Sequence, residues 1–178
     1  KRQKQLGSMQ QVDADAYRHS PDVTGGSVES MLSTFAGVTP ADELSSAYSV
    51  RGGSYDENSV YVDGVELFRR QLVTNGQQEG LSVINPSMVD KLIFSTGGFP
   101  AAYSDKMSSA LDITYRRPHG LDGNVSLGLM GAELAIGQGT DRFSQLHGLR
   151  YKRNASLLAT GDEKGEYDPR YFDYQTKI

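Results

Sequence analysis

The sequence predicts an α+β fold: a small mixed β-sheet with short helices, followed by longer strands of a different character. Twenty glycines against six prolines favour a turn-rich chain that contains strands over a helical bundle. Short alternating or continuous apolar runs occupy the middle of the chain, and one earlier segment has a clear helical period. At 178 residues, the chain is long enough to bury a core in one or two domains.

Residues 1–23 are polar and weakly periodic, so we expect an N-terminal arm or linker, with room for an edge strand around Leu6–Val12. The first firm element follows and has four apolar residues spaced along one helical face. Ser27 can cap this helix and Gly37 can stop it. The four apolar residues are Val28, Met31, Leu32 and Phe35.

Three short strands are expected next. Tyr48–Arg51 ends at the pair Gly52-Gly53. Ser59–Val62 and Val65–Phe68 flank Asp63-Gly64, which is the strongest two-residue hairpin signal because both central positions need a positive φ.

Asn85-Pro86 has the form of an N-cap followed by proline at the first helical position, which predicts a short helix through Lys91. Leu92–Phe94 is then expected as a buried strand that breaks at Gly97-Gly98. Ala110–Arg116 alternates and predicts a further strand. The residues expected on its buried face are Leu111, Ile113 and Tyr115.

The character of the sequence changes after Pro118. Three alternating segments are separated by turns rich in Gly, Asp and Glu, which is the weak signature of transmembrane barrel strands and equally of ordinary soluble hairpins. In the first segment the apolar residues change face beyond Gly131, so we expect a β-bulge there. The segments are Asn124–Ile136, Phe143–Leu158 and Tyr171–Ile178.

Composition and motifs argue against several function classes. The 22 acidic and 18 basic residues lack the basic excess of a nucleic-acid groove, and the absence of cysteine removes thiolate chemistry and disulfides. No nucleophile elbow, phosphate loop or dinucleotide turn occurs, and the three histidines have no ligand spacing. We therefore expect no enzyme, no catalytic residue, no cofactor and no metal. An acidic cluster lacks the rhythm of a calcium loop; it comprises Asp56, Glu57, Asp63 and Glu66.

Five short sequence motifs between about residues 20 and 118 together resemble one known protein family. In their order and spacing they resemble the plug domain of a TonB-dependent outer-membrane receptor, of the type in which a carboxypeptidase-regulatory-like module precedes the plug. The blocks are Val50-Arg-Gly-Gly53, Asn58-Ser-Val-Tyr-Val-Asp-Gly64, Ile84-Asn-Pro86, Phe94-Ser-Thr-Gly-Gly-Phe-Pro-Ala-Ala-Tyr103 and Ser108-Ser-Ala-Leu-Asp-Ile-Thr-Tyr115.

The resemblance implies three parts: an arm at 1–23, a plug domain at 24–118, and the first strands of a transmembrane β-barrel at 119–178. The last part supplies about three spanning strands, so the barrel is incomplete and the chain is expected to be a fragment. The resemblance also implies the outer membrane of a Gram-negative bacterium. The implied function is the gate of a transporter that takes up a scarce extracellular ligand using energy.

The implied partners are TonB, through a segment upstream of residue 1, the receptor's own barrel, the outer membrane and an unidentified extracellular ligand. Arg51 is implied to latch the plug to the barrel, whereas Thr96 stands where many relatives carry a second arginine. The residues implied to face the ligand are Gly52, Gly53, Tyr55, Asp56, Asn58, Gly97, Gly98, Phe99 and Tyr103.

The alternative is a soluble periplasmic or extracellular binding module of α+β type. The two hypotheses differ in the surroundings of Leu127, Leu149 and Tyr151. These side chains face lipid in a receptor wall, and they face a core in a self-sufficient domain.

Overall fold

The computed structural model describes residues 4–6, 9–13, 28–32, 38–40, 48–50, 52, 58–68, 82–97, 109–128, 131–153 and 170–178. The chain divides into two compact units, Lys1–Arg116 and Arg117–Ile178, each of which is described by itself.

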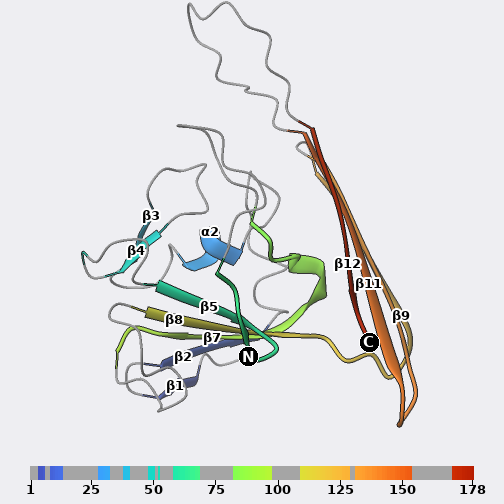
Figure 1. Ribbon diagram of the computed structural model, residues 1–178, viewed down its shortest axis with the longest axis horizontal. Coiled ribbons are helices and arrows are strands. Elements are labelled where there is room, and N and C mark those ends of the chain that lie inside the picture. Colours follow the sequence, from blue (N-terminus) through green and yellow to red (C-terminus); the bar gives the residue numbers. More distant parts are fainter. Residues whose placement is uncertain are drawn as a thin grey trace, which may run out of the picture. The chain divides into compact units, whose positions relative to one another are not determined.

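A six-stranded mixed sheet forms the centre of the first unit, with the order β1-β2-β7-β8-β5-β6 (Figure 1). All neighbouring strands are antiparallel except β5 and β8, which are parallel. The sheet confirms the predicted mixed topology. Its strands are β1 Lys4–Leu6, β2 Met9–Asp13, β5 Asn58–Val62, β6 Val65–Glu66, β7 Val89–Ser95 and β8 Ser109–Tyr115.

The core of this unit lies on the central strands and on the helix α2 (Val28–Leu32). Strand β8 buries the three residues predicted from its alternation, and its neighbours β7 and β5 add further apolar side chains. A two-stranded sheet pairs β3 (Val38–Pro40) with β4 (Tyr48–Val50). The buried apolar residues include Val28, Met31, Leu32, Val50, Val60, Leu92, Phe94, Leu111, Ile113 and Tyr115.

The hairpin predicted at Asp63-Gly64 is confirmed. Asp63 has φ 51° and Gly64 has φ 81°, and Val62 pairs with Val65 on either side of them. A positive φ at both central residues is the backbone of a type I′ turn, whose twist matches that of the flanking strands. The second strand is shorter than predicted because β6 ends at Glu66.

The helix predicted from Asn85 to Lys91 is wrong in length. Only Pro86–Met88 forms one 3₁₀ turn, η2, and Val89 is already extended at φ −72° and ψ 132°. Val89 pairs with Tyr115 of β8, and its side chain is fully buried. The long-range ladder and the buried β-branched side chain therefore outweigh the local helical signal.

The N-terminal arm contains a hairpin instead of the single edge strand expected around Leu6–Val12. Leu6, the last residue of β1, pairs with Met9, the first residue of β2, so the chain turns back between them. Strand β2 then pairs with β7 from Met9 to Asp13. In the sheet order β1 is therefore the outermost strand, and β2 is the strand that joins the hairpin to β7.

The second unit is an antiparallel meander with the order β12-β11-β10-β9. Its strands have 8 to 10 residues, close to the length of about 9–11 that spans a bilayer when tilted. Four strands replace the three expected from the sequence. They are β9 Gly120–Gly128, β10 Gly131–Gly139, β11 Ser144–Arg153 and β12 Arg170–Lys177.

The β-bulge expected near Gly131 is wrong, because Asn124–Ile136 contains two strands and not one. Gly128 pairs with Gly131, so the chain reverses direction between them. In that register an odd-numbered residue stands opposite an even-numbered one, as Val125 does opposite Leu134. The apolar residues therefore stay on one face of the sheet although their parity in the sequence changes.

Candidate functional site

One end of the six-stranded sheet gathers the two segments predicted to face a ligand. Because β5 and β8 are parallel and β7 runs against them, the starts of β5 and β8 and the end of β7 share this end (Figure 1). Asn58 pairs with Ser109, and Ser95 pairs with Ala110 beside them. The segment 51–57 enters at Asn58, and the segment 96–108 connects Ser95 to Ser109.

A buried polar contact holds this end of the sheet together. Ser109 Oγ donates a 2.7 Å hydrogen bond to Asn58 Oδ1, and both side chains are buried. On the next strand, buried Ser95 Oγ donates to the carbonyl of Gly97 at 3.2 Å. A buried hydroxyl needs such a partner, so these bonds fix the points from which the two segments leave the sheet.

Three of the predicted ligand-facing residues lie among the described ones: Gly52, Asn58 and Gly97. The side chain of Asn58 is only 4% exposed and bonds to Ser109 within the sheet. The remaining candidates lie outside the described residues, and so does the latch candidate. These are Arg51, Gly53, Tyr55, Asp56, Gly98, Phe99 and Tyr103.

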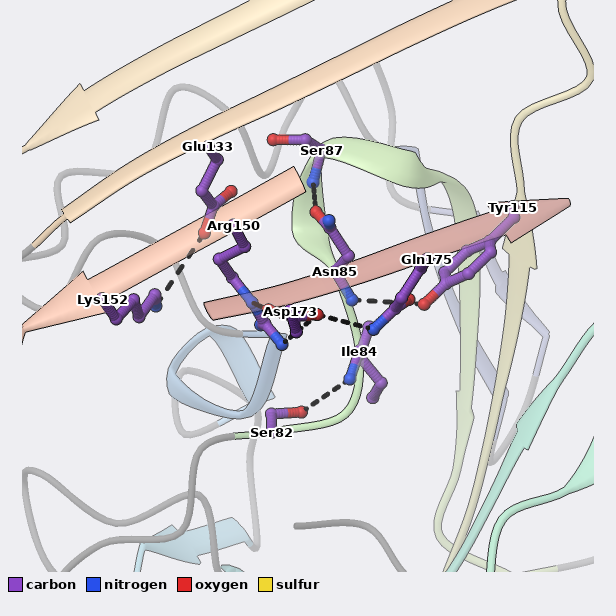
Figure 2. Close-up of polar contacts among 10 residues, drawn as sticks. All are labelled: Ser82, Ile84, Asn85, Ser87, Tyr115, Glu133, Arg150, Lys152, Asp173 and Gln175. Carbon is purple, nitrogen blue, oxygen red and sulfur yellow. Dashed lines mark hydrogen bonds and ion pairs between the residues drawn. The ribbon is translucent and has the colours of Figure 1, made fainter. Parts of the chain in front are cut away.

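The opposite end of the sheet is tied by a second set of polar contacts. Tyr115 N–H donates to Asp63 Oδ1 at 3.2 Å, and Asp63 N–H donates to the carbonyl of Ile113 at 2.9 Å. The buried Asn85 caps η2, accepting at Oδ1 from Ser87 N–H at 3.1 Å, and its own N–H donates to the hydroxyl of Tyr115 at 3.2 Å (Figure 2). These contacts join the hairpin, the 3₁₀ turn and the end of β8.

Two of the four residues in the acidic cluster noted in the sequence lie among the described residues, and both have structural roles. Asp63 belongs to the hairpin and to the contact with Tyr115, and Glu66 accepts a 3.1 Å hydrogen bond from Ser59 Oγ. Asp56 and Glu57 lie outside the described residues. Within the described ranges, no group of three or more His, Cys, Asp or Glu side chains could hold a metal ion.

The four-stranded unit has two faces of opposite character, as its register defines. One face, which we call the polar face, carries charged, amide and small side chains from all four strands. Pro118 lies against it, because a Cβ on Gly137 would stand 2.4 Å from Pro118 Cγ. The face also carries the larger Leu146 and Tyr171, and its members are Asp122, Asn124, Ser126, Glu133, Ala135, Gly137, Gly139, Ser144, Leu146, Gly148, Arg150, Lys152, Tyr171, Asp173, Gln175 and Lys177.

An ion-pair network crosses the polar face (Figure 2). Arg150 Nε lies 2.7 Å from Asp173 Oδ1, and its Nη2 lies 3.2 Å from Oδ2 of the same carboxylate. Gln175 Nε2 donates to Asp173 Oδ2 at 3.1 Å, and Lys152 Nζ lies 3.9 Å from Glu133 Oε1. Arg150 is 2% exposed, so the two-bond pairing satisfies a guanidinium that solvent does not reach.

The other face, which we call the apolar face, is exposed. Leu127 is 79% exposed and Tyr151 is 40% exposed, whereas Leu149, two residues before Tyr151 on β11, is half-buried. These residues therefore do not form a closed core. The exposed large side chains on this face are Leu121, Val125, Leu127, Ile136, Tyr151, Phe172, Tyr174 and Ile178.

Polar side chains on the apolar face gather near the 140–143 turn. His147 Nδ1 lies 2.6 Å from the hydroxyl of Tyr174, and the two rings stack at a centroid distance of 6.0 Å. Gln145 Nε2 donates to Gln138 Oε1 at 3.3 Å in the same region. Aromatic rings with polar tips suit a boundary between an apolar medium and water.

Sequence reasoning missed the buried roles of Ser95 and Ser109 and the pairing of Arg150 with Asp173. Ser109 stands 51 residues from Asn58, so only the parallel register brings them together.

No helix of the described part of the chain is both long and apolar enough to cross a bilayer.

A family model matches more than half of the chain. Residues 1–110 match the family model described as TonB-dependent Receptor Plug Domain. No curated protein sequence matches the chain.

Three solved structures of similar fold are much longer than this chain. The outer membrane transporter YddB from Escherichia coli is 12% identical with a TM-score of 0.60, over 82% of this chain and 26% of that one. The ferric enterobactin receptor PfeA from Pseudomonas aeruginosa is 17% identical with a TM-score of 0.54, over 84% of this chain and 24% of that one. The siderophore receptor PirA from Pseudomonas aeruginosa is 16% identical with a TM-score of 0.50, over 84% of this chain and 32% of that one. The chain thus spans about a quarter to a third of each.

Proposed function

The chain belongs to the TonB-dependent receptor plug domain family, and we propose that it forms the gate and first wall strands of an outer-membrane receptor for energised uptake. The arm at 1–23 and the plug at 24–118 close the pore, and residues 119–178 begin the wall. The site of action is the outer membrane of a Gram-negative bacterium. The partners are TonB, the rest of the barrel and an extracellular ligand of unidentified chemistry.

The observation that carries this proposal is the sidedness of β9–β12. Their exposed face is apolar, and their opposite face carries charges that pair with one another. Spanning barrels have this arrangement, with apolar residues toward lipid and polar residues toward the lumen. A soluble binding module would instead bury Leu127 and Tyr151, so their exposure argues against that alternative.

The connections suggest an orientation in the membrane. Only residues 140–143 separate β10 from β11, whereas residues 154–169 separate β11 from β12. Barrels have short periplasmic turns and longer extracellular loops. Although residues 129–130 form a shorter connection at the same end as 154–169, we take the long 154–169 connection to decide the orientation, so the 140–143 turn faces the periplasm and β9, whose first residue pairs with Gly139, starts from that side.

The N-terminal hairpin provides a route from TonB to the ligand-facing end of the plug. Pulling upstream of Lys4 loads β1, which is held by three residue pairs, and then β2, which is held to β7 by five. Met9 of β2 pairs with Ser95, the residue from which the 96–108 segment leaves the sheet. Removing β2 takes away the neighbour of Ser95 and thereby loosens that segment.

The proposal also assigns the residues that contact the ligand and the residue that holds the plug to the barrel wall. The segments 51–57 and 96–108 touch the ligand through Gly52, Gly53, Tyr55, Asp56, Gly97, Gly98, Phe99 and Tyr103, whereas the buried Asn58, also expected to face the ligand, anchors the first segment to the sheet. Arg51 pairs with a carboxylate of the wall and holds the plug in place. The shared sheet end of Asn58, Ser95 and Ser109 supports the first assignment, because both segments start there.

The gating proposal is tested by comparing the whole receptor with a variant that lacks residues 1–116, each reconstituted in planar bilayers. The whole receptor should conduct ions only in brief openings, whereas the variant should show a large and steady conductance, because the strands then enclose an open lumen. Equal conductance in the two proteins would refute a gate. Recovery of the whole receptor from cells as a soluble protein would refute the membrane assignment.

A further inference from the structure

The connector that leads from β8 into β9 lies against the polar face of the four-stranded unit. Pro118 is buried, although the residues on either side of it, Arg117 and His119, are exposed. A Cβ on Gly139 would overlap the carbonyl oxygen of Pro118, and a Cβ on Gly137 would stand 3.0 Å from Pro118 Cβ. The proline therefore rests directly on two glycines of β10, which we call the glycine seat.

The seat requires glycine for space and not for backbone conformation. Neither Gly137 nor Gly139 has a positive φ, so other residues could adopt the same backbone. Because they are two positions apart on one strand, both leave room on the same face of the sheet. Gly120, which does have a positive φ of 86°, turns the chain from Pro118 into β9, where it pairs with Gly139. The connector is thus folded over β10 at the point where β10 has no side chains.

The connector is anchored on both sides of a single residue. Arg116 N–H donates a 2.8 Å hydrogen bond to the carbonyl of Met88 within the first unit, and Pro118 is held by the glycine seat within the second. Only Arg117 lies between these anchors, and consecutive Cα atoms are about 3.8 Å apart, so the connection has no slack. The ring of Pro118 also fixes its φ, which stiffens the chain there. The end of β8 can leave the wall only if one of the two anchors breaks.

Strand β8 is well placed to serve as the stationary part of the plug. It pairs with β7 at six positions and with β5 at five, so it lies inside the sheet and supports both neighbours. It is also the last strand of the first unit along the chain, so pulling upstream of Lys4 reaches it last. If β8 stays in place, β7 and β5 keep the ladder to which they return.

We propose that Pro118, Gly137 and Gly139 fix the end of β8 to the wall while the gate is pulled, so that the plug closes again on a stationary strand. The two glycines act through Pro118 and are positioning residues. This inference rests on the proposed function, since it requires residues 1–116 to act as a gate.

The test reconstitutes the whole receptor in planar bilayers and measures the fraction of time for which it conducts. Gly139→Ala adds a methyl group that overlaps the carbonyl of Pro118 and should lift the connector from its seat. The matched control is Gly123→Ala on β9, where the nearest atom to the new methyl group would be 3.7 Å away. Gly139→Ala should raise the open fraction about tenfold, which is the effect of strain of ordinary size, and the control should conduct as the parent does.

A spin label follows the connector directly. Arg117→Cys carries the label at an exposed position of a chain without cysteine, and its electron paramagnetic resonance spectrum should show a more mobile label with Gly139→Ala than with Gly123→Ala. Pro118→Gly, which removes the ring without adding an atom, should also raise label mobility and the open fraction. Its result decides the question where the Gly139→Ala receptor does not form a folded barrel.

The outcomes separate the anchor from the gate. A parent receptor that conducts steadily would refute the proposed function first. A parent that opens only briefly, with seat variants that do the same, would overturn the anchor alone. Seat variants that lower barrel stability but change neither label mobility nor the open fraction would also overturn it, because the seat would then only support the wall. An equal rise in the open fraction with Gly123→Ala would overturn it as well.

Discussion

Locking the N-terminal hairpin to β7 tests how pulling reaches the plug. Gln11 of β2 pairs with Ile93 of β7, and both side chains are half-buried, so Gln11→Cys with Ile93→Cys disturbs little of the core. Neighbouring strands place paired Cα atoms about 4.5–5.5 Å apart, within the range of a disulfide. The chain has no cysteine of its own, so the new pair forms the only bridge within it.

The expected gain in stability follows from a comparison of the disulfide with the natural contacts that hold β2. Its ladder to β7 has five residue pairs, and Val12 is its one apolar side chain described as buried, which contributes about 1.5–3 kcal/mol. A disulfide that closes a loop of about 80 residues stabilises the folded state by up to about 4.5 kcal/mol. The bridge is therefore expected to hold β2 more strongly than its natural contacts do.

The assay pulls on a handle upstream of Lys4 in the membrane-embedded receptor by force spectroscopy. In the reduced variant the first rupture should occur at low force and release β1 and β2, about ten residues or about 35 Å. In the oxidised variant the load passes to β7, so the first rupture should move to higher force. Gln138→Cys with Gln145→Cys, a cross-strand pair in the second unit, is the matched control and should leave the first rupture unchanged. Equal first-rupture forces in the oxidised and reduced hairpin variants would refute the reasoning.

Three further substitutions probe the turn, the wall and the latch. Gly64→Val should destabilise the first unit by about 1–2 kcal/mol in chemical unfolding, because valine disfavours φ 81°, and a variant as stable as the parent would contradict the assigned turn. Arg150→Ala should lower the stability of the receptor barrel by about 3 kcal/mol, since it leaves the Asp173 carboxylate without its cation; Asp173→Asn leaves the more deeply buried Arg150 guanidinium without its anion and should cost at least as much, and an unchanged stability in both variants would argue against an uncompensated charge as the cause. Arg51→Ala should raise small-solute leakage through the whole receptor if Arg51 is the latch, and unchanged permeability would remove it from that role.

Local signals predicted the parts of the fold that depend on few residues. Asp63-Gly64 specified its hairpin because both residues accept a positive φ that most side chains disfavour. The alternation of β8 identified Leu111, Ile113 and Tyr115 as buried, because one face of that strand must meet the core. Asn85 was identified as a cap for the same local reason, although the helix beyond it was overestimated.

The remaining features depend on register between distant segments, which sequence patterns do not encode. The buried contact of Ser109 with Asn58 requires the parallel pairing of β5 with β8 across 51 residues. The candidate site is accordingly less predictable than the strands around it. Its glycines mark where the chain turns, whereas the side chains that anchor those turns are serines whose burial the sequence alone did not indicate.

Charge placement in the second unit shows how register carries functional information beyond hydrophobicity. A period of two assigns Arg150 and Lys152 to one face of β11 and Tyr151 and Arg153 to the other, but it does not say which face meets lipid. The partners across the strands decide this, because carboxylates stand near Arg150 and Lys152, whereas Tyr151 stands opposite the exposed Phe172. Cations that face a lumen can be neutralised by neighbouring carboxylates of the wall itself.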